Sequence, residues 1–190
     1  MRNIAIFASG AGTNARNIIK YFSLNEKIKV SIVVSNNPKA GVHEEAQKLQ
    51  VPSITLSKND FISGQPVLNL LNKYQIDFIV LAGFMCKIAE NILQSFPNRI
   101  INIHPALLPK YGGKGMYGNH VHEAVVAAGE KETGITIHYI NENYDEGNII
   151  FQTSCKISQS DTPDTVASKV HALEYKYYPV IIEKLLTQEV

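Results

Sequence analysis

The chain has 190 residues, which is the usual size of one domain and enough to bury a substantial core. Its formal net charge of +1 gives no bulk electrostatic reason to bind nucleic acid or an anionic membrane. No apolar run approaches the length of a membrane span, and the start of the chain lacks the features of a signal peptide. The two cysteines, Cys86 and Cys155, form no paired motif, which fits a reducing compartment. We expect one cytoplasmic domain over residues 1–190.

Apolar segments alternate along the chain with segments of helical periodicity. The apolar segments predict strands at residues 3–8, 28–34, 77–82 and 99–103, with a weaker one at 52–56. The helical patterns lie between them, at about residues 12–22, 41–50, 64–74, 86–95 and 118–128. Unbroken hydrophobicity is typical of strands that are buried on both faces of a parallel sheet. The alternation therefore predicts an α/β fold, with helices on both faces of a mostly parallel twisted sheet.

The last third of the chain predicts a different arrangement. Strands at residues 134–140 and 148–157 are joined by a turn, so this part of the sheet should be antiparallel. A long helix follows, with Thr162 as its N-cap and Pro163 at its first position. Its core-facing stripe consists of residues at three- and four-residue steps: Val166, Val170, Leu173 and Tyr177. Pro179 should kink or end this helix.

A glycine-rich turn, Gly10-Ala11-Gly12-Thr13-Asn14-Ala15, follows the first predicted strand and opens the first predicted helix. Such a turn lets backbone N–H groups approach an anion at a helix N-terminus. A dinucleotide site would also need an acidic residue at the end of the second strand, where this chain has Val34-Ser35-Asn36-Asn37. We therefore expect a phosphomonoester and no nicotinamide cofactor, with Thr13 and Asn14 as added donors. The alternative is a plain tight turn.

Two polar residues, Asn102 and His104, end the strand predicted at residues 99–103. Strand side chains alternate between faces, so these two point the same way. Pro105 then stops further pairing, because it has no N–H to donate. An amide and an imidazole therefore stand together at the carboxyl end of a strand, where open α/β sheets bind ligands. Read alone, such a pair is also compatible with a structural histidine.

The other polar candidates are less specific. A polar loop at residues 141–147 carries three carboxylates, Glu142, Asp145 and Glu146, and Asp145 by itself reads as a turn residue. His138 shares a strand face with Thr136, so it either approaches the site or lies in the core. His120 and His122 lack a third ligand, and we expect no metal site. The glycine-rich connection between Pro105 and Gly118 predicts a lid, or else an inert flexible loop.

Four stretches, taken together and in order, resemble the folate-dependent formyltransferases. They are Ser9-Gly10-Ala11-Gly12-Thr13-Asn14, Leu81-Ala82-Gly83-Phe84-Met85, Asn102-Ile103-His104-Pro105-Ala106-Leu107-Leu108-Pro109, and Asp145-Glu146-Gly147-Asn148-Ile149-Ile150. The resemblance runs from about residue 3 to about residue 180. It implies a single-domain, Rossmann-like fold and formyl transfer from 10-formyltetrahydrofolate, without a metal or nicotinamide.

The resemblance also implies roles for particular residues. Asn102 and His104 would stabilise the oxyanion of the reaction, and Asp145 would assist proton transfer. The amine substrate would be bound by Gly12, Thr13, Asn14, Ala15, Pro105 and Glu174. The folate would be bound by Met85, Cys86, Lys87, Ile88, Asn102, Asn141, Glu142, Asn143, Tyr144 and Asp145. The chain departs from the family in having Cys86 where Arg is common, and no Arg in Ile62-Ser63-Gly64-Gln65 faces the folate glutamate tail.

Within this family, the tRNA-dependent member carries an additional C-terminal domain and the folate hydrolase an N-terminal one, and we expect neither here. The expected substrates are therefore small molecules, formyl folate and the glycyl amine of glycinamide ribonucleotide. A sugar-nucleotide amine is the alternative acceptor. A non-catalytic phosphate-binding module would need only the glycine turn and would leave Asn102, His104 and Asp145 unexplained. The sequence is compatible with a monomer or a homodimer.

Overall fold

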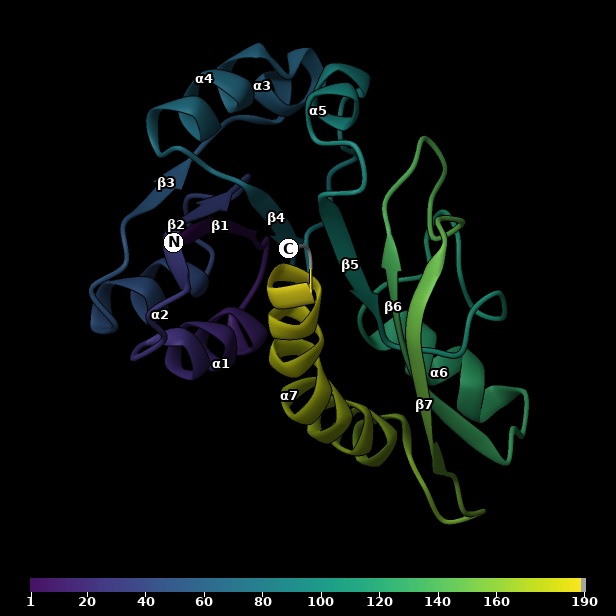
Figure 1. Ribbon diagram of the computed structural model, residues 1–190. Helices are drawn as coiled ribbons and strands as arrows, with labels where there is room; N and C mark the ends of the chain where they lie inside the picture. The colour runs from purple at the N-terminus through teal and green to yellow at the C-terminus, as the bar shows by residue number, and fades with distance from the viewer. Residues whose placement is uncertain (189–190) are drawn as a thin grey trace.

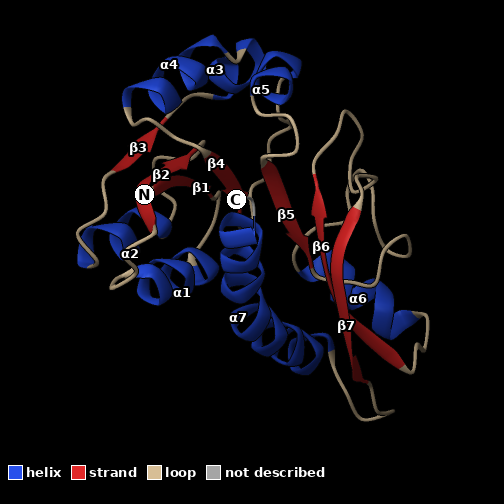
Figure 2. Ribbon diagram, viewed as in Figure 1, coloured by secondary structure: helices blue, strands red, loops and turns tan. Residues whose placement is uncertain are grey.

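The structure, a computed structural model, describes residues 1–188 and contains one seven-stranded sheet between two layers of helices (Figure 1; Figure 2). The strands are β1 (Arg2–Phe7), β2 (Ile28–Ser35), β3 (Ser53–Thr55), β4 (Phe78–Leu81), β5 (Ile100–His104), β6 (Glu132–Tyr139) and β7 (Ile149–Lys156). The helices are α1 (Thr13–Phe22), α2 (Val42–Lys48), α3 (Lys58–Ser63), α4 (Gln65–Lys73), α5 (Glu90–Ser95), α6 (Asn119–Ala127) and α7 (Pro163–Gln188). Among residues 1–188, no helix combines the length and the apolar character that crossing a membrane requires.

The strand order, β3-β2-β1-β4-β5-β6-β7, explains where a ligand can bind. Strands β1 to β5 pair in parallel, and β6 and β7 are antiparallel, which confirms the predicted sheet. After β1 the chain first moves outward to β2 and β3 and then returns to the other side of β1 as β4. Connections leave the carboxyl ends of β1 and β4 in opposite directions, so a crevice opens there.

Each face of the sheet carries its own apolar core. Ile4 and Ile6 of β1 face the layer formed by α1, α2 and α7, whereas Ala5 and Phe7 face the layer formed by α3, α4 and α5. Both faces of β1 are fully buried from Ile4 to Phe7, which is why this part of its sequence is an apolar run without alternation. This rigid central strand places the glycine turn at a fixed point of the crevice.

Two helices differ from the sequence prediction. Helix α3 was not predicted, although Ser57 and Asp60 form a capping box at its start. The helix predicted at residues 86–95 begins only at Glu90, because the chain leaves β4 across the edge of the sheet, where the Met85 N–H donates to Ser9 Oγ. Residues 85–88, assigned to the folate pocket, therefore lie in an irregular segment.

Helix α7 continues through Pro179 to Gln188, so of the two predicted effects of this proline, a kink or an end, the end does not occur. A proline inside a helix lowers its stability by about 3 kcal/mol, but here the residues on both sides of Pro179 pack against the rest of the protein. Tyr178 is fully buried and donates its hydroxyl to Leu81 O at 2.8 Å, and Ile182 lies in the core. The stripe of fully buried residues also departs from the predicted one after Val170, because Leu173 and Tyr177 pack at the edge of the core.

Candidate active site

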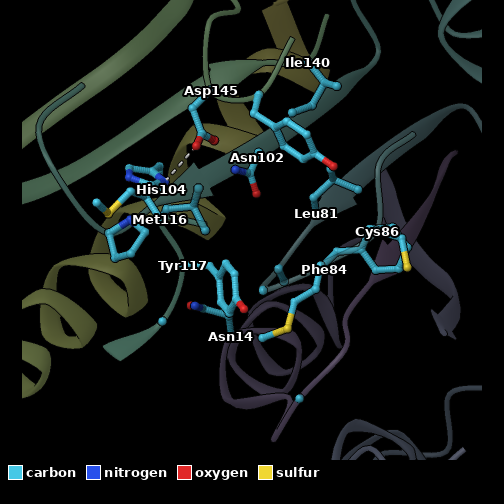
Figure 3. A pocket seen from close by; sticks show the side chains of 18 of the residues that line it. Asn14, Leu81, Phe84, Cys86, Asn102, His104, Met116, Tyr117, Ile140 and Asp145 are labelled. Atoms are coloured by element: carbon cyan, nitrogen blue, oxygen red, sulfur yellow. Dashed lines mark ion pairs between the residues drawn. The ribbon is translucent and has the colours of Figure 1, made fainter. Parts of the chain in front are cut away.

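A cavity of about 550 Å³ lies at the carboxyl ends of β1, β4 and β5 (Figure 3). Five segments surround it: the glycine turn, residues 81–88, the end of β5, the 105–118 loop and the 140–145 loop, with α7 closing one side. Every site residue expected from the sequence lines this cavity except Ala15, which lies on α1 and is buried in the apolar core between α1 and the sheet. The structure thus brings together residues from opposite ends of the chain, such as Asn14 and Glu174, which are 160 positions apart.

Gly12 fixes the path of the chain from β1 into α1. Its φ of +77° is unfavourable for other residues, and a Cβ there would lie 2.5 Å from Val42 Cα. Helix α1 has no side-chain cap, so the N–H groups of its first turn remain available to a ligand. The turn therefore presents backbone donors and a positive helix end to the cavity, which is what an anionic group requires.

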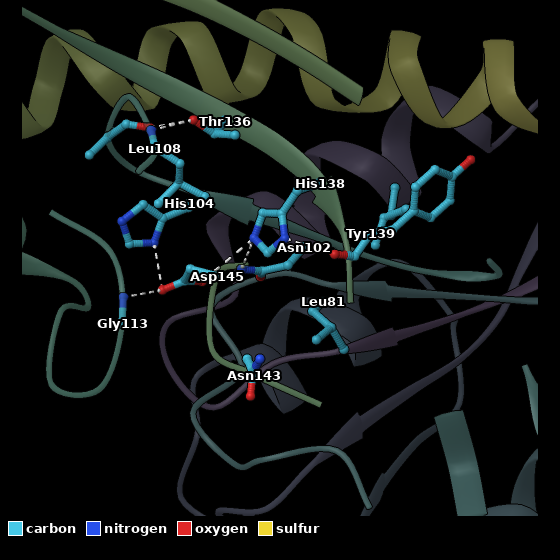
Figure 4. A network of polar contacts seen from close by, with 12 residues as sticks. Leu81, Asn102, His104, Leu108, Gly113, Thr136, His138, Tyr139, Asn143 and Asp145 are labelled. Carbon is cyan, nitrogen blue, oxygen red and sulfur yellow. Dashed lines mark hydrogen bonds and ion pairs between the residues drawn. The ribbon is translucent and has the colours of Figure 1, made fainter. Parts of the chain in front are cut away.

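The amide of Asn102 is oriented by His138 (Figure 4). His138 is fully buried, and its Nδ1–H donates to Tyr139 O at 2.9 Å, because a carbonyl oxygen can only accept. Its Nε2 lies 3.3 Å from Asn102 Nδ2 and 3.5 Å from Asp145 Oδ1, so it accepts from the amide when the ring is neutral and donates to the carboxylate when the ring is protonated. One N–H of the amide is used in this way and the second is left for a ligand. Of the two positions predicted for His138, it is buried in the core and at the same time contacts the site through Asn102.

His104 is held between the 105–118 loop and Asp145. Its Nε2 donates to Tyr111 O at 2.7 Å, and its Nδ1 lies 3.5 Å from Asp145 Oδ2. Burial lowers the pKa of His104, and the negative charge of Asp145 only partly opposes this effect. A proton on Nδ1 would face a carboxylate, so this nitrogen can exchange a proton through Asp145.

Asp145 reaches the site because the 140–147 loop folds back over β5. Gly147 makes this possible, since a Cβ there would lie 1.7 Å from Tyr139 O. Asp145 Oδ2 accepts the Gly113 N–H at 3.0 Å, and Oδ1 lies 3.5 Å from His138 Nε2. Burial by itself would raise the pKa of Asp145, but the hydrogen bond with His138, the charge of His104 and the Gly113 N–H together lower it.

These three side chains form a set with distinct chemical abilities. Asn102 offers a fixed N–H donor, His104 a titratable ring and Asp145 an ionised carboxylate, all at one wall of the cavity. A donor that is positioned in advance stabilises negative charge as it develops on an oxygen. A paired imidazole and carboxylate move a proton. Attack of a nucleophile on a carbonyl carbon needs both functions.

At the opposite wall, Asn14 and Glu174 bind each other across most of the chain. Asn14 Nδ2 donates to Glu174 Oε2 at 2.9 Å, and Asn14 Oδ1 is buried without a hydrogen-bond partner among residues 1–188. Glu174 is only 5% exposed, so it is not a solvated carboxylate on the surface of α7. Burial raises the pKa of Glu174 to about 7, although the hydrogen bond from Asn14 opposes the shift.

This shift predicts how stability depends on pH. Between pH 4.5 and about 7, folded Glu174 keeps a proton that the unfolded chain releases, so its contribution to the free energy of unfolding falls as pH rises. The difference in the free energy of unfolding between wild type and Glu174→Gln should therefore change by about 3 kcal/mol at most over this range. Urea unfolding of both proteins at several pH values measures the difference. Parallel stability curves would contradict the prediction.

Several lining residues were not predicted. Met116 and Tyr117 of the 105–118 loop project into the cavity near His104 and Asn14 (Figure 3), and Lys114 lines it as well. The glycine-rich composition of that loop was the only sequence signal for them. His122 and His171 also line the cavity, and burial lowers the pKa of His122 to about 4. His122 was considered in the sequence only as a metal ligand together with His120, and no pattern pointed to His171.

Other candidate residues have ordinary surroundings. His120 lies on the surface beside Glu123, and Glu146 is exposed and accepts a hydrogen bond from Asn143. Cys86 and Cys155 are free and half-buried, and burial raises the pKa of both thiols. Within residues 1–188, no three His, Cys, Asp or Glu side chains converge in a way that could hold a metal ion.

An α/β sheet with a glycine turn and an amide, imidazole and carboxylate at its crevice is compatible with a group-transfer enzyme. The family model "Formyl transferase" matches residues 2–182, and the chain belongs to this family. It is 35% identical over 191 residues to the phosphoribosylglycinamide formyltransferase of Bacillus subtilis, covering 98% of this chain and 95% of the relative. The chloroplastic phosphoribosylglycinamide formyltransferase of Arabidopsis thaliana is 36% identical, and the match covers 100% of this chain and 67% of that protein.

Solved structures agree with this assignment. The crystal structure of phosphoribosylglycinamide formyltransferase from Bacillus halodurans is 36% identical and superposes with a TM-score of 0.89, covering 100% of this chain and 97% of that one. The corresponding protein from Anaplasma phagocytophilum gives a TM-score of 0.90 at 30% identity, covering 98% and 87%. The chain is therefore a formyltransferase, an enzyme that transfers a one-carbon group.

Proposed function

We propose that the enzyme transfers the formyl group of 10-formyltetrahydrofolate to the glycyl amine of glycinamide ribonucleotide, a step of purine biosynthesis. The observation that carries this proposal is that one cavity holds a phosphate-type turn on one side and the Asn102, His104 and Asp145 set on the other. A substrate with a phosphate at one end and an amine at the other fits such a cavity. The names of the relatives support the same substrate.

The proposed reaction begins when the amine attacks the formyl carbon, which forms a C–N bond and places negative charge on the formyl oxygen. The free N–H of Asn102 donates to that oxygen, and a protonated His104, whose Nε2–H stays bonded to Tyr111 O, stabilises it through its positive charge and its Nδ1–H. The amine proton leaves through Asp145, directly or through water, and N10 of the folate gains a proton as its bond to the formyl carbon breaks. The intermediate then collapses to the formamide and tetrahydrofolate.

We place the two ligands at opposite ends of the cavity. The phosphate lies on the turn at Gly12, Thr13 and Asn14, with Ala15 supporting the turn from the core. The ribose lies near Glu174 and the unpaired Asn14 Oδ1, because both accept hydrogen bonds from hydroxyl groups. Pro105 borders the amine.

The folate lies on the other side of the cavity. Its flat pteridine occupies the space between residues 85–88 and 141–145, which offer backbone groups and apolar surface. Cys86 and Lys87 stand where family members often carry an Arg.

An assay of formyl transfer tests the proposal. Purified protein should consume 10-formyltetrahydrofolate with glycinamide ribonucleotide, and neither EDTA nor the omission of NAD should lower the rate. The same assay should be run with a panel of other amines, including amino-sugar nucleotides. A faster reaction with a sugar nucleotide would show that the acceptor is an amino-sugar nucleotide. A requirement for zinc or NAD would contradict the mechanism. Binding of the ribonucleotide without turnover would indicate a non-catalytic module.

A further inference from the structure

Ser9 connects three strand ends beneath the cavity. It lies between β1 and the glycine turn and is only 8% exposed. Its hydroxyl donates to Asn36 Oδ1 at 2.6 Å and accepts the Met85 N–H at 2.9 Å. Asn36 follows β2 and Met85 follows β4, so one hydroxyl joins the carboxyl ends of β1, β2 and β4. A hydroxyl suits this place because it donates and accepts at once.

The backbone of Ser9 is held independently of its side chain. Its N–H donates to Gly83 O at 3.0 Å, and the neighbouring Ala8 N–H donates to Val34 O at 3.0 Å. Loss of the hydroxyl therefore leaves the start of the glycine turn in place. The groups that lose a partner are the N–H of Met85 and Oδ1 of Asn36.

Met85 begins the irregular segment 85–88, which lines the cavity before α5 starts at Glu90. An irregular segment depends on individual hydrogen bonds, because it has no ladder or helix to fix its backbone. The bond from the Met85 N–H to Ser9 thus sets the direction in which residues 85–88 leave β4.

Asn36 occupies the end of β2, where a dinucleotide-binding protein places the carboxylate that binds ribose hydroxyls. Here its side-chain oxygen turns toward Ser9 and fixes the rotamer of the serine hydroxyl. With its hydrogen committed to Asn36, Ser9 Oγ directs its lone pairs toward the Met85 N–H. The order of donation is therefore Met85 to Ser9 to Asn36.

We propose that Ser9 and Asn36 are positioning residues that hold the folate-binding segment 85–88 in its productive orientation. The inference rests on the proposed function for the identity of the ligand. It assigns Ser9, which directly precedes the glycine turn, to the folate side of the reaction and not to the phosphate side.

The test compares Michaelis constants for the two substrates. Ser9→Ala should raise KM for 10-formyltetrahydrofolate about tenfold, since the hydrogen bond that positions the Met85 N–H is lost. KM for the ribonucleotide should stay within about twofold, because the glycine turn keeps its backbone bonds. Ser35→Ala is the matched control. It removes another buried strand-end hydroxyl, one that bonds to the backbone of Asn37 and not to Met85.

Variants of Asn36 show whether this residue orients segment 85–88 through Ser9 or only stabilises the fold. Asn36→Asp keeps an acceptor for Ser9 and should retain a near-normal folate KM, whereas Asn36→Leu should raise it. Adding Asn36→Leu to Ser9→Ala should raise it little further, because the connection to Met85 is already broken. These variants also test the proposal if Ser9→Ala fails to fold.

Three outcomes would overturn the inference. The first is a normal folate KM in Ser9→Ala, the second an equal rise in both KM values, and the third an equal effect of Ser35→Ala. Calorimetric titration with tetrahydrofolate distinguishes this failure from failure of the proposed function. Weaker binding to Ser9→Ala than to wild type supports the inference even if wild type does not formylate the ribonucleotide. A wild type that binds no folate contradicts both.

Discussion

Replacing Asp145 by alanine is expected to lower kcat on the order of a thousandfold, the middle of the range for loss of general acid–base assistance. The carboxylate faces His104 and His138 and accepts the Gly113 N–H, so its loss removes the proton route and the charge that favours a protonated His104. Single-turnover measurement at saturating substrate isolates the chemical step. Asp145→Asn should be almost as slow, because it keeps the shape of the side chain but not its charge.

The control for this prediction is Glu146→Ala. Glu146 is the next residue in the same loop, but it is exposed and bonds to Asn143. Its replacement should leave kcat within about twofold, as expected for a solvated surface carboxylate. If Glu146→Ala loses most activity while Asp145→Ala retains it, the wrong carboxylate has been assigned.

The second large effect is expected for Asn102→Ala, which should lower kcat about a hundredfold or more, the usual result of removing one oxyanion donor. KM should change little, because the free N–H acts mainly when charge develops on the formyl oxygen. Asn102→Asp should be at least as slow, since it places a carboxylate where a donor is needed.

His138→Ala provides a graded comparison for Asn102. It removes the acceptor that orients the amide and leaves the amide itself, so its loss of kcat should be smaller. A large rise in KM with unchanged kcat in Asn102→Ala would assign this residue to ground-state binding instead.

The sequence predicted the parts of the fold that depend on local patterns. Buried parallel strands, the glycine turn and the Thr162 cap all leave short-range signals, and the Thr165 N–H does donate to Thr162 Oγ1. The course of α7 past Pro179 was not predictable, because it depends on the burial of Tyr178 against β4, nearly a hundred positions away. Tertiary packing there outweighed the local preference of proline.

The site shows the same division. The sequence at the end of β5 indicated Asn102 and His104, because polar side chains on one face of a buried strand are costly unless they bind a partner or a ligand. The contact of Asp145 with the Gly113 N–H, and that of Asn14 with Glu174, join segments whose separation in the sequence carries no signal. The family resemblance indicated these residues, and the structure adds their partners.

The pairing of Asn14 with Glu174 has a consequence for synthesis of the protein. Helix α7 is hydrogen-bonded to α1 at several points, through Asn14 to Glu174, Asn17 to Tyr175 O, and Tyr21 to Glu183. One wall of the cavity therefore does not exist until α7 has been synthesised and has packed against α1. The glycine turn and the β5 side chains come from earlier parts of the chain, and they form a complete cavity only when this late helix is in place.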